Sequence, residues 1–177
     1  MKNMKYIGAI ALFSVSVVAF GQNNIQSLKA AGFRVACPCT LVENTNFIKM
    51  IKSQGNEILG AYICLENKDN PEYVAITNIN INDLSDSYTS LLPSTYSHFE
   101  KQFLESYASQ LATSGLDYKN ITYKGVPALE YSFEQMGIPT KAIIFLKEKK
   151  SILIQVGSRH DLITKFNALK FSFEIMN

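Results

Sequence analysis

The sequence has almost no surplus charge, only three cysteines and none of the short motifs that mark common enzyme sites. Lysine and arginine number 17 against 15 aspartate and glutamate residues, for a formal net charge of +2. Both surplus charges, Lys2 and Lys5, lie in the first five residues, so the chain beyond residue 21 is neutral. This balance excludes a strongly basic nucleic-acid-binding protein and an acidic disordered chain.

Motifs for catalysis and for phosphate binding are also missing. The chain has no Gly-x-Ser-x-Gly elbow, no His-Glu-x-x-His motif and no glycine-rich phosphate loop. Its two histidines, His98 and His160, each lie at a predicted helix start, where solvent-facing positions are common. The sequence therefore predicts no catalytic residue and no cofactor, although a hydrolase site around one histidine is kept as a minor hypothesis.

The first 21 residues have the pattern of a secretory signal peptide. An uncharged run over residues 6–20 follows Lys2 and Lys5. Ala19 and Gly21 provide the small residues that precede a cleavage site, here before Gln22. The run is short for a membrane span of about 20 residues, and no later run reaches that length. We expect a signal peptide (residues 1–21), export to the periplasm or the medium, and one domain over residues 22–177 with no membrane span.

Export would place the three cysteines in an oxidising compartment, where disulfides persist. Cys37, Cys39 and Cys64 can form one internal bridge at most. The favoured interpretation pairs Cys64 with Cys37 or Cys39. Two alternatives stay open: a metal or redox site using Cys37, Cys39 and Cys64, and three buried free thiols.

Hydropathy patterns predict strands in two groups separated by a long helix. The alternation over residues 33–37 predicts a strand that ends at Pro38, and residues 25–31 predict a helical turn closed by Gly32. Short connections favour antiparallel pairing of the strands in the first group. Further predicted strands cover residues 47–51, 58–65, 73–81, 120–123, 126–133, 142–146 and 152–156.

Two helices are predicted from apolar residues at helical spacing. The first covers residues 96–114, with a capping box at Ser97 and Glu100 and a C-terminal cap at Gly115. The second covers residues 160–170, is capped by the polar stretch at residues 158–161, and runs into an extended tail. Consecutive strands on either side of a long helix predict an α+β fold, an antiparallel sheet with helices packed on its faces.

Asparagines alternate along one strand and are the only binding candidates outside the cysteines. Asn78, Asn80 and Asn82 would share one face of the strand over residues 73–81 and its extension. If that face were exposed, the amides could bind sugar or peptide groups. An ordinary solvated strand face is the competing interpretation.

Three short segments resemble the PsbP-like superfamily. Residues 32–35 (Gly-Phe-Arg-Val) run into the Cys37-Pro38-Cys39 element, like the opening of that superfamily. Residues 125–128 (Gly-Val-Pro-Ala) and the closing stretch at residues 166–173 are similar as well. The resemblance implies an α/β/α sandwich around an antiparallel sheet, and an accessory, scaffold or chaperone-like role. The Cys-Pro-Cys element departs from the common pattern.

These observations favour an exported, non-enzymatic accessory or binding module of the bacterial cell envelope. Its partner would be another envelope or secreted protein, and neither nucleic acid nor membrane is expected to bind. The alternative is a thiol-dependent metal-binding or redox protein that uses Cys37, Cys39 and Cys64.

Overall fold

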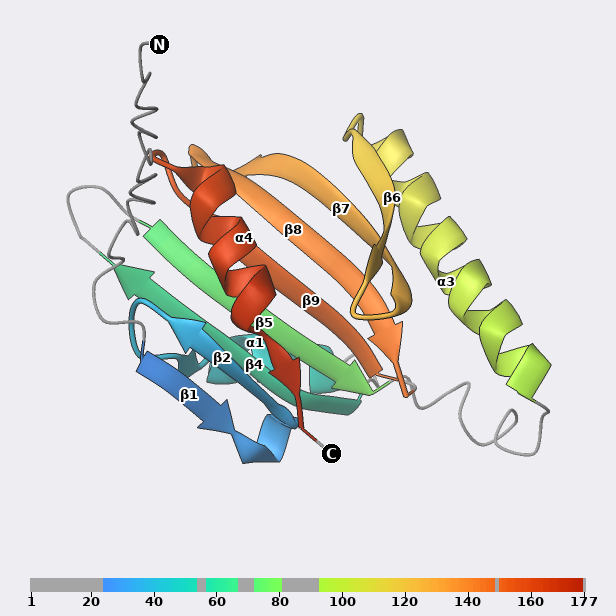
Figure 1. The fold of residues 1–177 in the computed structure, drawn as a ribbon, viewed down its shortest axis with the longest axis horizontal. Helices are drawn as coiled ribbons and strands as arrows, with labels where there is room; N and C mark the ends of the chain where they lie inside the picture. The colour runs from blue at the N-terminus through green and yellow to red at the C-terminus, as the bar shows by residue number, and fades with distance from the viewer. Residues whose placement is uncertain (1–23, 54–56, 67–71, 81–92, 149, 177) are drawn as a thin grey trace, which may run out of the picture.

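A seven-stranded antiparallel sheet with the order β3-β4-β5-β9-β8-β7-β6 forms the centre of the computed structural model (Figure 1). The structure describes residues 24–53, 57–66, 72–80, 93–148 and 150–176. The strands of this large sheet are β3 (Val42–Glu43), β4 (Glu57–Glu66), β5 (Glu72–Asn80), β6 (Tyr118–Tyr123), β7 (Val126–Gln135), β8 (Ile138–Lys147) and β9 (Lys150–Gly157). The expected signal peptide and Asn82 lie outside the described residues.

A small antiparallel sheet joins the two ends of the described chain. Its order is β1-β2-β10, so the last strand pairs with the second one. These strands are β1 (Asn24–Leu28), β2 (Phe33–Cys37) and β10 (Glu174–Ile175). The helices are η1 (Lys29–Ala31), α1 (Thr45–Ser53), α3 (Pro93–Thr113) and α4 (Leu162–Ser172).

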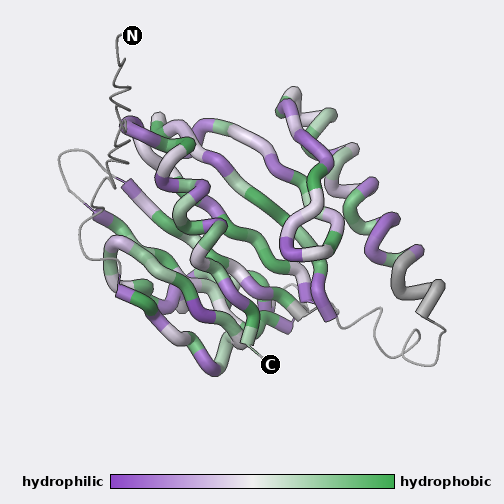
Figure 2. The backbone as a smooth tube through the Cα atoms, viewed as in Figure 1, coloured by the Kyte–Doolittle hydropathy of each residue, from purple (hydrophilic) through white to green (hydrophobic). Residues whose placement is uncertain are grey.

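Both faces of the large sheet are covered, which explains the nearly continuous apolar runs of its central strands β8 and β9 (Figure 2). Alternate residues of β8 belong to different clusters: Phe145 packs with Phe166 of α4, whereas Ile144 packs with Leu104 and Leu111 of α3. In Figure 1, α4 and the small sheet lie in front of the large sheet and α1 lies behind it. The expected α+β fold is confirmed, and the small sheet adds to the layer that contains α4.

Aromatic rings join the small sheet, α4 and the large sheet. Phe173, which follows α4, lies with its ring centroid 5.2 Å from that of Phe33 in β2 and 6.3 Å from that of Phe145 in β8. Tyr123 of β6 completes the group at 5.1 Å from Phe145. Because all four side chains are buried, these rings fix the position of both chain ends on the sheet.

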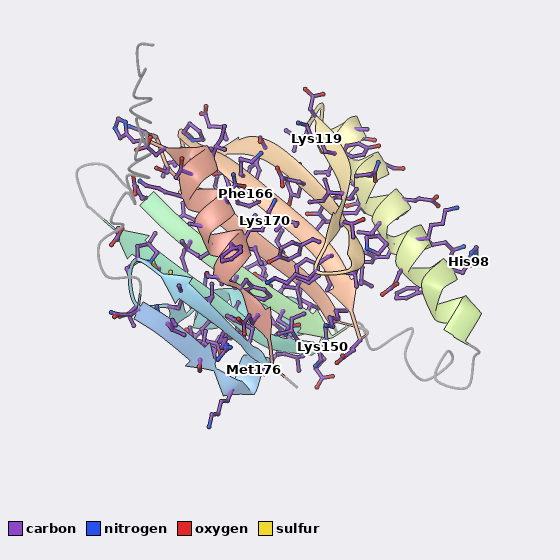
Figure 3. The ribbon with its side chains drawn as sticks, in the orientation of Figure 1. His98, Lys119, Lys150, Phe166, Lys170 and Met176 are labelled. Carbon is purple, nitrogen blue, oxygen red and sulfur yellow. A yellow bond between two sulfur atoms is a disulfide. The ribbon has the colours of Figure 1, made fainter. Side chains whose placement is uncertain are left out.

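An ion-pair cluster ties the C-terminal turn of α4 to the sheet. Lys170 of α4 lies 2.6 Å from Glu130 of β7, and Lys141 of β8 lies 3.0 Å from the same carboxylate. Burial alone would raise the pKa of Glu130, but the hydrogen bonds from the two lysines outweigh it and lower the pKa. The ammonium group of Lys170 also lies over the ring of Phe166, 5.1 Å from its centroid (Figure 3), and that of Lys141 lies 5.5 Å from the same centroid.

The predicted strand over residues 47–51 is wrong, because these residues form helix α1. Asn44 caps the helix, with its side-chain Oδ1 accepting a hydrogen bond from the backbone N–H of Phe47 at 3.1 Å. Phe47, Ile48 and Ile51 then pack together against β4. Their spacing fits a helical face as well as a strand, and the cap decides between the two.

Two further boundaries differ from the prediction. Residues 24–28 form β1 instead of a helical turn, and only residues 29–31 turn, closed as expected by Gly32 at φ +69°. Helix α3 begins at Pro93, a favoured first residue, so Ser97 lies inside the helix and the capping box is wrong. The predicted C-terminal cap is confirmed: Gly115 has φ +70° and the Leu116 N–H bonds to the Leu111 carbonyl at 2.9 Å.

Substitutions on α4 test which of its faces is in the core. Phe166 is 0% exposed and Phe171 is 88% exposed on the same helix. Phe166→Ala should lower the free energy of unfolding by about 3–5 kcal/mol, because it leaves a cavity in the core. Phe171→Ala should change it by less than about 0.5 kcal/mol. Urea titrations followed by circular dichroism measure both values, and equal losses would contradict this packing.

The Glu130 cluster predicts a pH-dependent contribution to stability. Since the pKa of Glu130 is lowered from its usual 4.5 in the folded state, its stabilisation is complete above that pH and disappears as the pH falls through the folded pKa. Glu130→Gln should therefore cost about 1.5 kcal/mol at pH 7 and progressively less towards pH 3. Glu105→Gln, in an exposed pair with Lys101, is the control with almost no cost. A Glu130→Gln cost that is constant across this pH range would refute the assignment.

Candidate functional site

Cys39 and Cys64 form a disulfide that joins the segment after β2 to strand β4. Their Cα atoms lie 5.7 Å apart, and the bridge spans 25 residues of sequence. Of the two pairings expected for Cys64, the structure thus contains the one with Cys39. Gln26 of β1 holds the same segment by its side chain, donating to the Cys39 carbonyl and accepting from the Leu41 N–H, both at 2.8 Å.

Cys37 is a free thiol in the core next to this bridge. Its side chain is 0% exposed, and its sulfur lies 3.5 Å from that of Cys64. The pKa of the Cys37 thiol is raised to about 11, mainly by burial; a backbone hydrogen bond at Cys39 lowers it in part, and the nearby charge of Glu66 adds to the increase. A thiol with such a pKa is protonated at neutral pH and is the opposite of an activated cysteine nucleophile.

A pocket of about 380 Å³ opens beside the disulfide, between the small sheet and α4. Its floor is the large sheet, and its side walls are Pro38 from the segment after β2 and Ala168 from α4. The bridge itself forms part of the wall. The remaining apolar lining comes from Ala36, Val74, Val156 and Leu169. The volume lies within the range of roughly 300–1,000 Å³ that is typical of ligand sites.

A hydrogen-bonded ion pair borders this pocket. Glu72 of β5 accepts hydrogen bonds from Lys165 of α4 at 2.6 Å and from the Ser158 hydroxyl at 2.8 Å. Ser158 is itself buried and accepts from the His160 backbone N–H at 3.1 Å. Lys165 and Glu72 neutralise each other, and Glu66 is the other charged residue of the lining.

Sequence reasoning missed this ion pair. Glu72 belongs to a polar stretch that could simply be solvated, and Ser158 was predicted only as a helix cap. The position of Lys165 could be predicted from the sequence, because it lies one turn before the buried Leu169 and therefore at the edge of the apolar face of the helix. Its partner on β5 is distant in sequence, and no local pattern indicates it.

Asn78 of the predicted asparagine row does not lie on an exposed face. Asn78 is 2% exposed, and its amide donates to the Ala31 carbonyl at 2.8 Å, which ties η1 to the large sheet. Because η1 covers β5 at this position, Asn78 is neither a binding candidate nor part of a solvated strand face. The side chains of Asn80 and Asn82 lie outside the described residues.

The two histidines lie on opposite layers and do not form one site. His98 is exposed on α3, where its ring contacts Gln102 at 3.0 Å, and Figure 3 shows it pointing away from the sheet. His160 is exposed in the turn before α4. The structure therefore does not bring the two histidines together into one hydrolase site.

Metal binding by the cysteines is not favoured by this arrangement. The disulfide uses two of the three sulfurs, and a single protonated thiol is not a metal site. Within the part of the chain that the structure describes, no group of three or more His, Cys, Asp or Glu side chains is placed to hold a metal ion. No helix of the same residues is long and apolar enough to cross a membrane.

Comparison with known proteins finds similar structures but no similar characterised sequence. No protein-family model and no curated protein matches the chain. Cyanobacterial PsbP from Synechocystis sp. PCC 6803 is similar over 93% of this chain and 98% of its own, with 14% identity and a TM-score of 0.47. The expected likeness to PsbP-like proteins is thus found among solved structures.

Two more solved structures are similar over about two thirds of the chain. PA94, a protein of unknown function from Pseudomonas aeruginosa, has 14% identity, a TM-score of 0.38 and coverage of 63% of this chain and 77% of its own. LpqN of Mycobacterium tuberculosis, which is involved in cell envelope biogenesis, has 12% identity, a TM-score of 0.29 and coverage of 67% and 72%. Similarity at this level transfers no function.

The disulfide should make a measurable contribution to stability. Closing a loop of 25 residues stabilises the folded state by about 3 kcal/mol. Dithiothreitol should therefore lower the free energy of unfolding of the wild type by about that amount in urea titrations. Cys64→Ala removes the cysteine that forms the bridge, so its stability should not respond to the reductant. A wild type that is equally insensitive would contradict a structural bridge.

Proposed function

We propose that the protein is an exported, non-enzymatic accessory module of the bacterial cell envelope, which binds an apolar segment of another envelope or secreted protein in the pocket beside Cys39–Cys64. The observation that carries this proposal is the position of the disulfide, which forms a wall of the pocket. A structural disulfide is stable in oxidising compartments and rare in the cytosol, which supports export.

The chemistry of the pocket supports binding over catalysis. Its lysine and one of its glutamates are paired with each other, and the nearby thiol of Cys37 has a raised pKa. A cysteine nucleophile in an enzyme is activated by a lowered pKa or an adjacent base, and the pKa of Cys37 is raised instead. A pocket with apolar walls, in which Lys165 and Glu72 are paired with each other, suits an apolar side chain of a partner protein.

Filling the pocket tests this proposal. Ala168→Trp places an indole in the pocket, whereas Asn167→Trp adds the same ring on the exposed side of α4. The tagged full chain would be expressed with its leader, cross-linked in cells and purified from the envelope fraction. Envelope proteins captured by the wild type and by Asn167→Trp should fall at least tenfold with Ala168→Trp.

Two results would overturn the proposal. One is equal recovery of every cross-linked protein with both tryptophan variants, which would exclude the pocket. The other is a protein that stays in the cytoplasm with its leader uncleaved and all thiols reduced, which would exclude export. Intact mass under non-reducing conditions distinguishes that state from a mature chain that begins at Gln22 with one disulfide.

A further inference from the structure

The sulfur atoms of Cys37, Cys39 and Cys64 lie close together, and only those of Cys39 and Cys64 are bonded to each other. The Cys37 sulfur lies 3.5 Å from the Cys64 sulfur, which is bonded to Cys39. A disulfide bond is about 2.05 Å long, so the thiol needs to approach by roughly 1.5 Å. Side-chain rotation can provide a shift of that size, while Gln26 holds the backbone at Cys39 and Leu41 in place.

The two sulfurs that compete for Cys64 differ in exposure. Cys37 is completely buried, whereas Cys39 is partly exposed and lines the pocket. Exchanging the partner of Cys64 would therefore move the free thiol from the core to the pocket wall.

We infer that Cys64 is the shared centre of an internal thiol–disulfide exchange, and that the exchange presents Cys39 as a thiol modification site in the pocket. The Cys37 thiol loses its proton to solvent and its sulfur attacks the Cys64 sulfur. The Cys37–Cys64 bond forms as the Cys39–Cys64 bond breaks, and Cys39 leaves as a thiolate that takes up a proton. The step is redox-neutral and needs no oxidant or reductant.

The exposed Cys39 thiol would react with soft electrophiles and with disulfides of small thiols. With a disulfide RSSR, Cys39 would form a mixed disulfide and release one thiolate RS⁻. The pocket beside Cys39 has room for such a group. This inference does not depend on the proposed function, because it concerns the three sulfurs and not the identity of a bound partner.

Burial sets the rate at which the exchange begins. The pKa of Cys37 is about 11, because of burial and the charge of Glu66 in β4. The other charged side chains around the adjacent pocket are Glu72 of β5 and Lys165 of α4, which are paired. Below pH 11 the thiolate fraction of Cys37 rises tenfold with each pH unit, and the exchange should accelerate by about the same factor.

Alkylation of the folded protein tests the inference. The oxidised wild type would be incubated with N-ethylmaleimide at pH 7, 8 and 9, quenched with acid, digested without reduction and mapped by mass spectrometry. The expected product carries the maleimide on Cys39 and a Cys37–Cys64 disulfide, and its rate rises about tenfold per pH unit. A maleimide on Cys37 with Cys39–Cys64 intact, or a thiol that reacts only after denaturation, would overturn the inference.

Two variants provide the matched controls. Cys37→Ala has no attacking thiol, so it should keep Cys39–Cys64 and take up no maleimide at any of these pH values. In Cys39→Ser the only cysteines that remain are Cys37 and Cys64. Its oxidised form should therefore contain the Cys37–Cys64 disulfide and no free thiol by intact mass. Maleimide uptake by Cys37→Ala at the wild-type rate, or a folded Cys39→Ser that keeps two thiols under oxidising conditions, would refute the exchange. Circular dichroism verifies that both variants are folded.

Discussion

The two ends of the chain together cover one face of the large sheet, and the rest of the structure depends on that contact. The ring of Phe173, near the end, packs against that of Phe33, near the start, and meets Phe145 in the middle of the sheet edge-on. The hydrophobic effect drives this burial, and the pairing of β10 with β2 fixes its register. The pocket, the disulfide and the Glu72–Lys165 pair all lie in the same layer, because each joins the small sheet or α4 to the strands beneath.

The sequence predicts the elements well where a periodic pattern coincides with a local signal. Residues 33–37 and β7 follow from alternation, the long helix ending at Gly115 follows from helical spacing, and β8 and β9 follow from two apolar runs joined by a charged turn. Residues 47–51 fit both periods, and the deciding cap at Asn44 lies outside that segment. Periodicity also groups Asn78 with its face of β5, but only the small sheet, built from distant residues, determines that this face is buried.

The candidate site is less predictable, because its parts come from widely separated segments. The oxidising compartment expected for an exported protein and the three cysteines of the sequence indicate a bridge to Cys64. The choice of Cys39 over Cys37 as its partner depends on how the backbone turns at Pro38. A strand alternates its side chains, so Cys37 continues the buried row of Phe33 and Val35 while the turn frees Cys39. The pocket between Pro38 and Ala168 exists only once α4 lies beside the small sheet.

The pairing of β10 with β2 also has a consequence for the order of events in folding. Strand β2 pairs on one side with the neighbouring β1, but its second partner, β10 (residues 174–175), is the last strand of the described chain. Contacts of such sequence separation form late, since the loop between them must be closed first. A growing or threading chain therefore cannot complete this layer from its N-terminal part alone. This layer closes only when the segment that contains Phe173 and β10 is present, so a chain truncated before Phe173 would leave the aromatic face of the sheet open.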